Sequence, residues 1–284
     1  MKKFFSNLGK ALLYFGTYLG AQFAVSFVVS LVISVFVSIS MVKPDGSFDM
    51  EAYMEKANAA GGAAIYYILI AAGIITLVAF WIVTLIRKKK IMKEVSLVKF
   101  NPVAAIPVLF AGIAFNFLIS YGLSVIPFPQ SWVDSYATKS GELLGGTGIA
   151  MWIALVIMAP LVEEITFRGF VYSRLKNGMA KWIAVILTSL IFGIAHGSII
   201  WLIYTFVFSL VLIYILERGG SLWLTILFHV GFNIVGAALS AYPQIAENWN
   251  DWVVLGVTAG VTVVCTLLFV LLTKKKNAET GLEA

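Results

Sequence analysis

Long apolar segments constrain this chain more than any other feature of its sequence. A helix that crosses the hydrocarbon core of a bilayer needs about 20 predominantly apolar residues. Segments of this length recur along the chain, and we expect spanning helices at 17–41, 63–86, 102–126, 149–172, 181–198, 200–216, 221–242 and 252–273. The predicted fold class is therefore all-α, a polytopic membrane helix bundle of about eight transmembrane helices.

The composition excludes several classes of protein. Of the 284 residues, 61% are hydrophobic and only 12% are charged, whereas soluble domains carry about 25% charged residues. A soluble enzyme, a disordered regulator and a nucleic-acid-binding module are therefore excluded, and the lipid bilayer is an expected partner. The single cysteine, Cys265, lies in an apolar segment, so neither a disulfide framework nor a cysteine-based metal site is expected.

The distribution of basic residues predicts the orientation of the helices. Lys and Arg concentrate in the cytoplasmic loops of membrane proteins. If both termini are cytoplasmic and the spans alternate, all of the 20 Lys and Arg residues except Lys43, Lys56 and Lys139 fall on the cytoplasmic side. We therefore predict a multi-pass protein of the cell membrane with both termini in the cytoplasm.

Polar residues inside the apolar segments mark a candidate functional site. An ionisable side chain within a membrane is costly and usually serves a function. The residues concerned are two adjacent carboxylates and an arginine in the fourth span, the two histidines of the chain, and one asparagine: Glu163, Glu164, Arg168, His196, His229 and Asn233. At a rise of about 1.5 Å per residue, groups from three spans reach similar depths near the middle of the membrane.

These residue types suit the hydrolysis of an amide bond. A carboxylate beside an imidazole takes a proton from water and delivers it to a leaving amine, while further His or Asn donors stabilise an oxyanion. A zinc ion (Zn2+) held by Glu163, His196 and His229 is the alternative chemistry. For Glu164 and Arg168, which are spaced i, i+4, a purely structural ion pair is the competing interpretation.

Three short motifs, in this order, resemble those of the CAAX protease and bacteriocin-processing family, also called the abortive-infection family of intramembrane endopeptidases. The family motifs are E-E-x3-R, F-x3-H and H-x3-N, and here they begin at Glu163, Phe192 and His229. The first motif also carries the Phe-Arg-Gly continuation that starts at Phe167. We therefore interpret the chain as similar to this family.

The resemblance covers residues 149–240, which we expect to form the catalytic core. Residues 1–284 are expected to form a single membrane domain. Within it, residues 1–148 would supply accessory transmembrane helices and 252–273 the final one. Because these flanking segments carry no motif, they say little about the substrate.

The resemblance implies a role for each residue of the motifs. Glu163 would activate the water with the help of His196, and His229 and Asn233 would bind the developing oxyanion. No metal or other cofactor would be required, with Zn2+ as the alternative. Glu164 would complete the catalytic set, and the residues that shape and hold the site would be Arg168, Phe167 and Phe192.

The implied activity is that of an intramembrane endopeptidase of bacterial type. The expected substrate is a short peptide or the membrane-adjacent end of a protein. The alternatives are a non-proteolytic membrane regulator or bacteriocin-immunity protein with the same fold, and a proton or ion carrier.

Two features of geometry are also expected. Pro160 lies one turn before Glu163 and has no N–H to donate, which predicts a local opening of the helix. The side chains of Glu163, His196, His229 and Asn233 should line one cavity inside the membrane, open toward the cytoplasm or the lipid.

Overall fold

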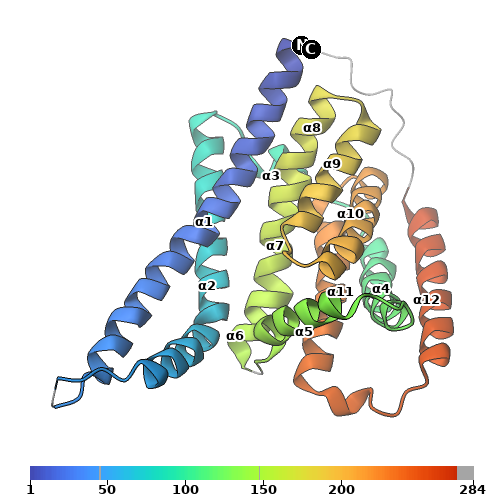
Figure 1. The fold of residues 1–284 in the computed structure, drawn as a ribbon. Helices are drawn as coiled ribbons and strands as arrows, with labels where there is room; N and C mark the ends of the chain where they lie inside the picture. Colours follow the sequence, from blue (N-terminus) through green and yellow to red (C-terminus); the bar gives the residue numbers. More distant parts are fainter. Residues whose placement is uncertain (45, 147, 274–284) are drawn as a thin grey trace.

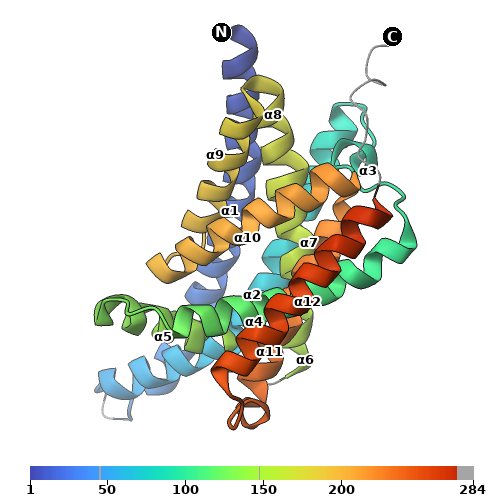
Figure 2. The same ribbon diagram turned by 90° about the vertical axis from the view of Figure 1, so that its right-hand side faces the viewer.

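The computed structural model describes residues 1–44, 46–146 and 148–273, which form a bundle of helices (Figures 1 and 2). No strand occurs in these described ranges, apart from an isolated bridge between Val42 and Phe48. The helices are α1 (Lys2–Met41), α2 (Met50–Ile86), α3 (Ile91–Glu94), η1 (Pro102–Ala104), α4 (Ala105–Ser124), α5 (Gln130–Leu144), α6 (Ile149–Trp152), η2 (Ile153–Met158), α7 (Ala159–Glu163), η3 (Glu164–Tyr172), α8 (Ser173–Gly178), α9 (Lys181–Ile194), α10 (Ile199–Gly219), α11 (Leu222–Ala241), η4 (Pro243–Ile245) and α12 (Asp251–Leu272).

The expected polytopic bundle is confirmed, with one difference in the number of full spans. Within the described residues, 7 helical segments are long and apolar enough to cross a membrane. The segment expected at 181–198 differs, because α9 has only 14 residues and is about 21 Å long. That length falls short of the ~30 Å hydrocarbon core. The protein is therefore a multi-pass membrane protein in which α9 is too short to span.

The chain reverses at residues 195–198, between α9 and α10, inside the bundle. Figure 1 shows α9 descending to about the middle of the molecule and α10 starting there. Gly197 has a φ of 76°, in the left-handed region that a residue without a Cβ adopts at little cost. The Ser198 hydroxyl then caps α10 by accepting a hydrogen bond from the Trp201 N–H. A glycine and a capping serine thus explain why one helix stops and the next begins.

The two ends of the bundle differ in charge. The basic end carries the start of α1, the 87–101 connector, and the turns at 178–181 and 219–221 (Figure 1). The opposite end carries the 42–49 loop, the start of α6 and the 242–250 connector. Lys and Arg residues are concentrated in the segments of the basic end, whereas the segments named for the opposite end carry Lys43 alone.

The helical segment 149–178 is continuous but changes its hydrogen-bond register. It is π-helical in η2 and again in η3. The N–H of Ala159 donates to the carbonyl of Ala154, five residues earlier, and the next residue, Pro160, has no N–H. This departure from regular α-helix agrees with the opening expected at Pro160, and π-helical turns are common at functional sites.

Candidate active site

The adjacent carboxylates Glu163 and Glu164 lie at the junction of α7 and η3 and have different surroundings. The Glu164 side chain is 0% exposed, while that of Glu163 is 16% exposed and lines a cavity. Because neighbouring residues of a helix point in different directions, one carboxylate faces the protein interior and the other faces the cavity. The two glutamates of the motif are therefore not interchangeable.

Glu164 joins an arginine and a histidine through one oxygen atom. Its Oε1 accepts a hydrogen bond from Arg168 Nη1 at 2.9 Å and lies 2.9 Å from His229 Nδ1. The Arg168 guanidinium also lies over the ring of Phe192, 4.2 Å from its centroid. All four side chains are buried, so removing any charge from this group leaves another charge unpaired in the interior.

This contact fixes the hydrogen-bonding roles of His229. An ionised carboxylate only accepts hydrogen bonds, so Nδ1 of His229 is the donor to Glu164. The other ring nitrogen, Nε2, is directed toward Glu163, with 3.9 Å to its Oε2. Glu164 thus orients the ring and holds the proton on Nδ1, as carboxylates do for imidazoles in functional sites.

His196 lies in the turn that follows α9 rather than within a helix. Its Nδ1 is 2.7 Å from the carbonyl oxygen of Phe192. Since a carbonyl oxygen only accepts, Nδ1 carries the proton, and Nε2 remains as an acceptor in the neutral ring. The F-x3-H spacing therefore serves a physical purpose, because the backbone of Phe192 selects the tautomer of His196.

Asn233 is held by a carbonyl that Pro160 leaves without a backbone donor. The Leu155 carbonyl would pair with the N–H of residue 159 in an α-helix or with that of residue 160 in a π-helix. Ala159 donates to Ala154 instead, and Pro160 has no N–H. The Leu155 carbonyl accepts from Asn233 Nδ2 at 2.7 Å. One N–H of the Asn233 amide is used in this bond, and the second remains.

One cavity brings the candidate residues together. It has a volume of about 280 Å³, and its lining includes Glu163, His196, His229 and Asn233. The sequence expectation of a shared cavity is confirmed for these four side chains. Glu164 and Arg168, together with Phe167, lie outside the lining and pack behind it, whereas Phe192 contributes its ring to the cavity wall.

The cavity wall also contains polar residues that the sequence interpretation missed. Asn116 lines it and donates from Nδ2 to the Phe232 carbonyl at 2.9 Å, which ties α4 to α11. Ser120 donates to Asn116 Oδ1 at 3.3 Å, and Ser140 of α5 lines the same cavity. The sequence could have indicated Asn116, because a polar amide inside the apolar segment 102–126 is the same feature that identified Asn233.

The donor set does not match a metal centre. Within the part of the chain that the structure describes, no group of three or more His, Cys, Asp or Glu side chains is arranged to hold a metal ion. Glu163, His196 and His229 share a cavity without forming such a group, so we derive no step through zinc.

The fold and the site thus define a polytopic helical membrane protein with a carboxylate, imidazoles and an amide at one intramembrane cavity. Residues 145–235 match the family model described as type II CAAX prenyl endopeptidase, Rce1-like. This segment contains all three motifs, so the resemblance found in the sequence is confirmed, and at family level it is one to CAAX-type endopeptidases.

A curated relative supports the same relationship. The UPF0177 protein YbdI of Lactococcus lactis subsp. lactis (strain IL1403) is 28% identical over 86 residues, which are 30% of this chain and 46% of that protein. The matched part therefore spans about half the length of this relative. No solved structure matches the chain.

Proposed function

We propose that this protein is an intramembrane endopeptidase that hydrolyses a peptide bond of a membrane-associated peptide or protein end. The observation that carries the proposal is the shared cavity of Glu163, His196, His229 and Asn233. The family match over residues 145–235 supports the reaction class. The partners are a peptide substrate and the lipid bilayer.

In the proposed reaction, water is the nucleophile and Glu163 is its general base. Glu163 accepts a proton from the water as the water oxygen bonds to the carbonyl carbon, and His196 Nε2 accepts a hydrogen bond from the same water. The resulting tetrahedral intermediate then expels the amine. The proton held by Glu163 passes to that amine as the C–N bond breaks, and the carboxylate is restored.

His229 and Asn233 are the proposed donors to the oxyanion. The hydrogen bond of His229 Nδ1 to the buried Glu164 directs Nε2 to the cavity side, and in the proposed reaction this nitrogen carries a proton when it donates to the oxyanion. The remaining N–H of Asn233 provides the second donor while Leu155 holds the amide in place. Donors fixed in advance stabilise the developing charge without reorganising at the moment of reaction.

Both termini are proposed to lie in the cytoplasm. The segments at the basic end of the bundle are much richer in Lys and Arg than those at the opposite end, and basic residues favour the cytoplasmic side of a membrane. No metal is proposed for the reaction, because a glutamate that activates water directly accounts for the residues at the cavity.

The test is a peptide-release assay with the purified full-length protein in lipid nanodiscs. Internally quenched fluorescent peptides carrying an apolar anchor serve as probes. We expect the wild type to cleave them and Glu163→Gln to lose at least about 10²-fold in rate. The matched control is Glu55→Gln, an exposed carboxylate of α2, which should cleave at the wild-type rate.

Three outcomes would contradict the proposal. A wild type that cleaves no probe favours a regulator or immunity protein with this fold. Glu163→Gln with full activity removes the general base. Activity that is lost on chelation and restored by Zn2+ replaces the metal-free reaction by a metalloprotease.

A further inference from the structure

The cavity at Glu163 occupies only one half of the height of the bundle. Along the helical segment 149–178, its lining residues are Leu155, Ala159 and Glu163, all of which precede η3. The lining residues of α4 lie between Asn116 and Leu123, in the half of that helix nearest the opposite end (Figure 1). The cavity therefore extends from Glu163 toward the opposite end of the molecule.

Helix α11 gives the same direction. Its lining residues run from His229, near the middle of the helix, to Leu239, near its end at the opposite end of the molecule. On α10 they run from Trp201 to Phe208, in the half that starts at the turn inside the bundle. The segment 149–178, α4 and α11 thus agree on the direction in which the cavity runs, and α10 borders it near the turn inside the bundle.

Buried side chains close the site toward the basic end. Phe167 and Arg168 are 1% exposed and Phe192 is 0% exposed. The rings of Phe167 and Phe192 meet edge to face, with 5.0 Å between centroids. The Arg168 guanidinium lies over the ring of Phe192. Phe167 and Arg168 follow Glu163 along the segment 149–178, so this buried aromatic layer lies on the basic-end side of Glu163.

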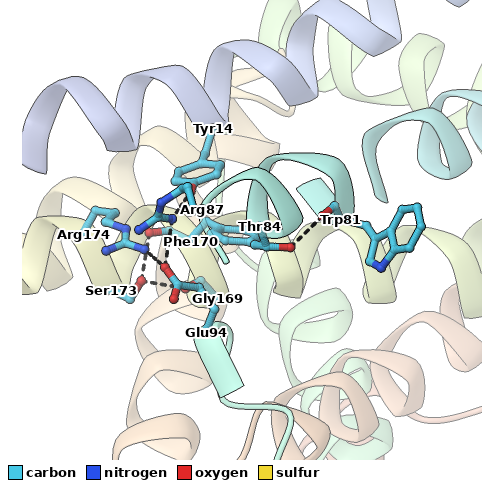
Figure 3. Close-up of polar contacts among 9 residues, drawn as sticks. All are labelled: Tyr14, Trp81, Thr84, Arg87, Glu94, Gly169, Phe170, Ser173 and Arg174. Carbon is cyan, nitrogen blue, oxygen red and sulfur yellow. Dashed lines mark hydrogen bonds and ion pairs between the residues drawn. The ribbon is translucent and has the colours of Figure 1, made fainter. Parts of the chain in front are cut away.

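The 87–101 connector adds a second layer at the basic end (Figure 3). The carboxylate of Glu94 contacts Arg87, at the start of the connector, and Arg174 of α8, and so ties the connector to α8. Val95, which is 1% exposed, packs directly on Gly169. A Cβ at Gly169 would lie 2.8 Å from that of Val95, so the connector approaches η3 as closely as the backbone allows.

Helix α5 forms the wall of the cavity on the side away from the aromatic layer. It lies across the bundle (Figures 1 and 2) and contributes Tyr136, Ser140, Leu143 and Leu144 to the lining. None of its residues, all of which are described, is buried. A helix that lines a cavity on one face while remaining accessible on the other forms a thin wall.

The attachments of α5 are concentrated near its C-terminal end. The carbonyl of Leu143 accepts from the Tyr66 hydroxyl at 3.1 Å, and that of Leu144 accepts from Ser240 at 2.7 Å. Nearer the middle of α5, Lys139 donates to the Gly197 carbonyl, next to His196. The first two turns of α5 have fewer such attachments among the described residues, so this end is the freer one.

The cavity wall beneath α5 suits an extended peptide. The hydroxyl oxygen of Ser140 is buried and has no hydrogen-bond partner among the described residues. Ser120, Tyr136 and Tyr204 add hydroxyl groups to a lining that is otherwise mainly apolar. Such groups pair with the N–H and C=O groups of an extended backbone, which are costly to bury unpaired.

We propose that the substrate reaches Glu163 from the opposite end, beneath α5, and that the substrates are extended segments of exported polypeptides on the extracytoplasmic side of the membrane. This inference rests on the proposed function and on the proposed orientation of the termini. It differs from the sequence expectation of a cavity open toward the cytoplasm or the lipid, because the aromatic layer and the connector lie on the basic-end side of the cavity.

Thiol labelling from each side of the membrane tests the inference without relying on hydrolysis. In a Cys265→Ser background, Ser120→Cys and Ser140→Cys place one thiol each in the cavity. The probe is 2-sulfonatoethyl methanethiosulfonate, a small anion that does not cross membranes. We expect both cavity thiols to react in intact cells at least about tenfold faster than in sealed inverted vesicles.

Two exposed positions act as controls for sidedness. Ser131→Cys, on the exposed face of α5, should react in intact cells, and Ser6→Cys, near the start of α1, should react in inverted vesicles. Cavity thiols that react only in inverted vesicles, or from neither side, overturn the inference. The reverse labelling of both controls overturns the orientation on which it rests.

Labelling of the same variants with Glu163→Gln added separates this inference from the proposed function. The side of access should not change, since access does not depend on the general base. A protein that labels as expected but hydrolyses no peptide contradicts the proposed function alone. A protein that hydrolyses peptides but labels only from the cytoplasmic side contradicts the inference alone.

Discussion

At the scale of single residues, the two adjacent glutamates contribute differently to stability and to activity. Glu164 shares one oxygen with Arg168 and His229 in a fully buried group. Breaking a buried ion pair by removing one partner costs about 3–5 kcal/mol. We expect Glu164→Gln to lower both stability and activity, and Glu163→Gln to lower activity alone. Thermal unfolding in detergent, followed by size-exclusion chromatography, measures the difference, and equal melting temperatures for the two variants would contradict it.

Pro160 is expected to position Asn233 through the free carbonyl of Leu155. In Pro160→Ala a new N–H competes for that carbonyl, and Asn233 loses part of a hydrogen bond worth about 0.5–1.5 kcal/mol. We expect kcat to fall about 3-fold to 10-fold at unchanged KM, because the Asn233 amide donates to the oxyanion only in the transition state.

Pro102→Ala is the matched control for this substitution, since Pro102 begins η1 at the basic end and frees no carbonyl near the cavity. Asn233→Ala, which removes the donor itself, should cost about 10²–10³ in kcat. A Pro160→Ala enzyme with wild-type kcat would show that Leu155 does not position the amide.

The sequence predicts the members of the site better than their arrangement. Glu163, His196, His229 and Asn233 stand out because polar groups are rare in apolar segments, and all four do line one cavity. The hydrogen bond between Asn233 and Leu155 could not be predicted, because it depends on a π-helical register that spacing does not reveal. Asn116 was missed because it belongs to no motif.

At the scale of helices, apolar length alone failed at one place, where α9 stops early. A run of apolar residues predicts burial equally well for one long helix and for two short ones joined by a tight turn. The sequence does contain the stop signal, since Gly197 and Ser198 are a typical helix end and a typical N-cap. The break expected between 198 and 200 lies close to the observed start of α10 at Ile199, and only the length of the preceding helix was wrong.

The turn at Gly197 is expected to be a sensitive element for activity. In Gly197→Ala the left-handed φ of 76° costs about 1–2 kcal/mol, and relaxation of the turn moves His196. We expect a greater loss in kcat than in stability, measured by peptide release and thermal unfolding. Gly256→Ala in α12 is the control, because a Cβ there meets no atom within 4 Å. Equal behaviour of the two variants would contradict this role.

At the scale of the whole molecule, the bundle is closed at the basic end and hollow toward the other end. Glu94 is central to the closed end, because its carboxylate lies between Arg87 and Arg174 (Figure 3). Its side chain is 14% exposed, so this is a partly buried cluster rather than a surface ion pair. Glu94→Ala leaves two like charges facing one another and loosens the 87–101 connector.

Loosening of the connector should be visible as faster proteolysis. The connector carries exposed lysines, including Lys88, Lys89 and Lys90, which trypsin reaches when the segment opens. We expect Glu94→Ala to be cut about 5-fold faster in sealed inverted vesicles, which corresponds to about 1 kcal/mol. Cleavage of this kind follows the population of the open form when opening and closing are fast.

The matched control is Lys43→Ala, which removes an exposed ion pair with Asp49 at the opposite end and leaves Asp49 as the N-cap of α2. Exposed pairs contribute little, so its connector should be cut at the wild-type rate. If substrates enter beneath α5, the initial rate of peptide release should be the same in Glu94→Ala as in the wild type. A Glu94→Ala protein that gains or loses activity in proportion to connector cleavage would instead place substrate entry at the basic end, because only then does opening that end change access to Glu163.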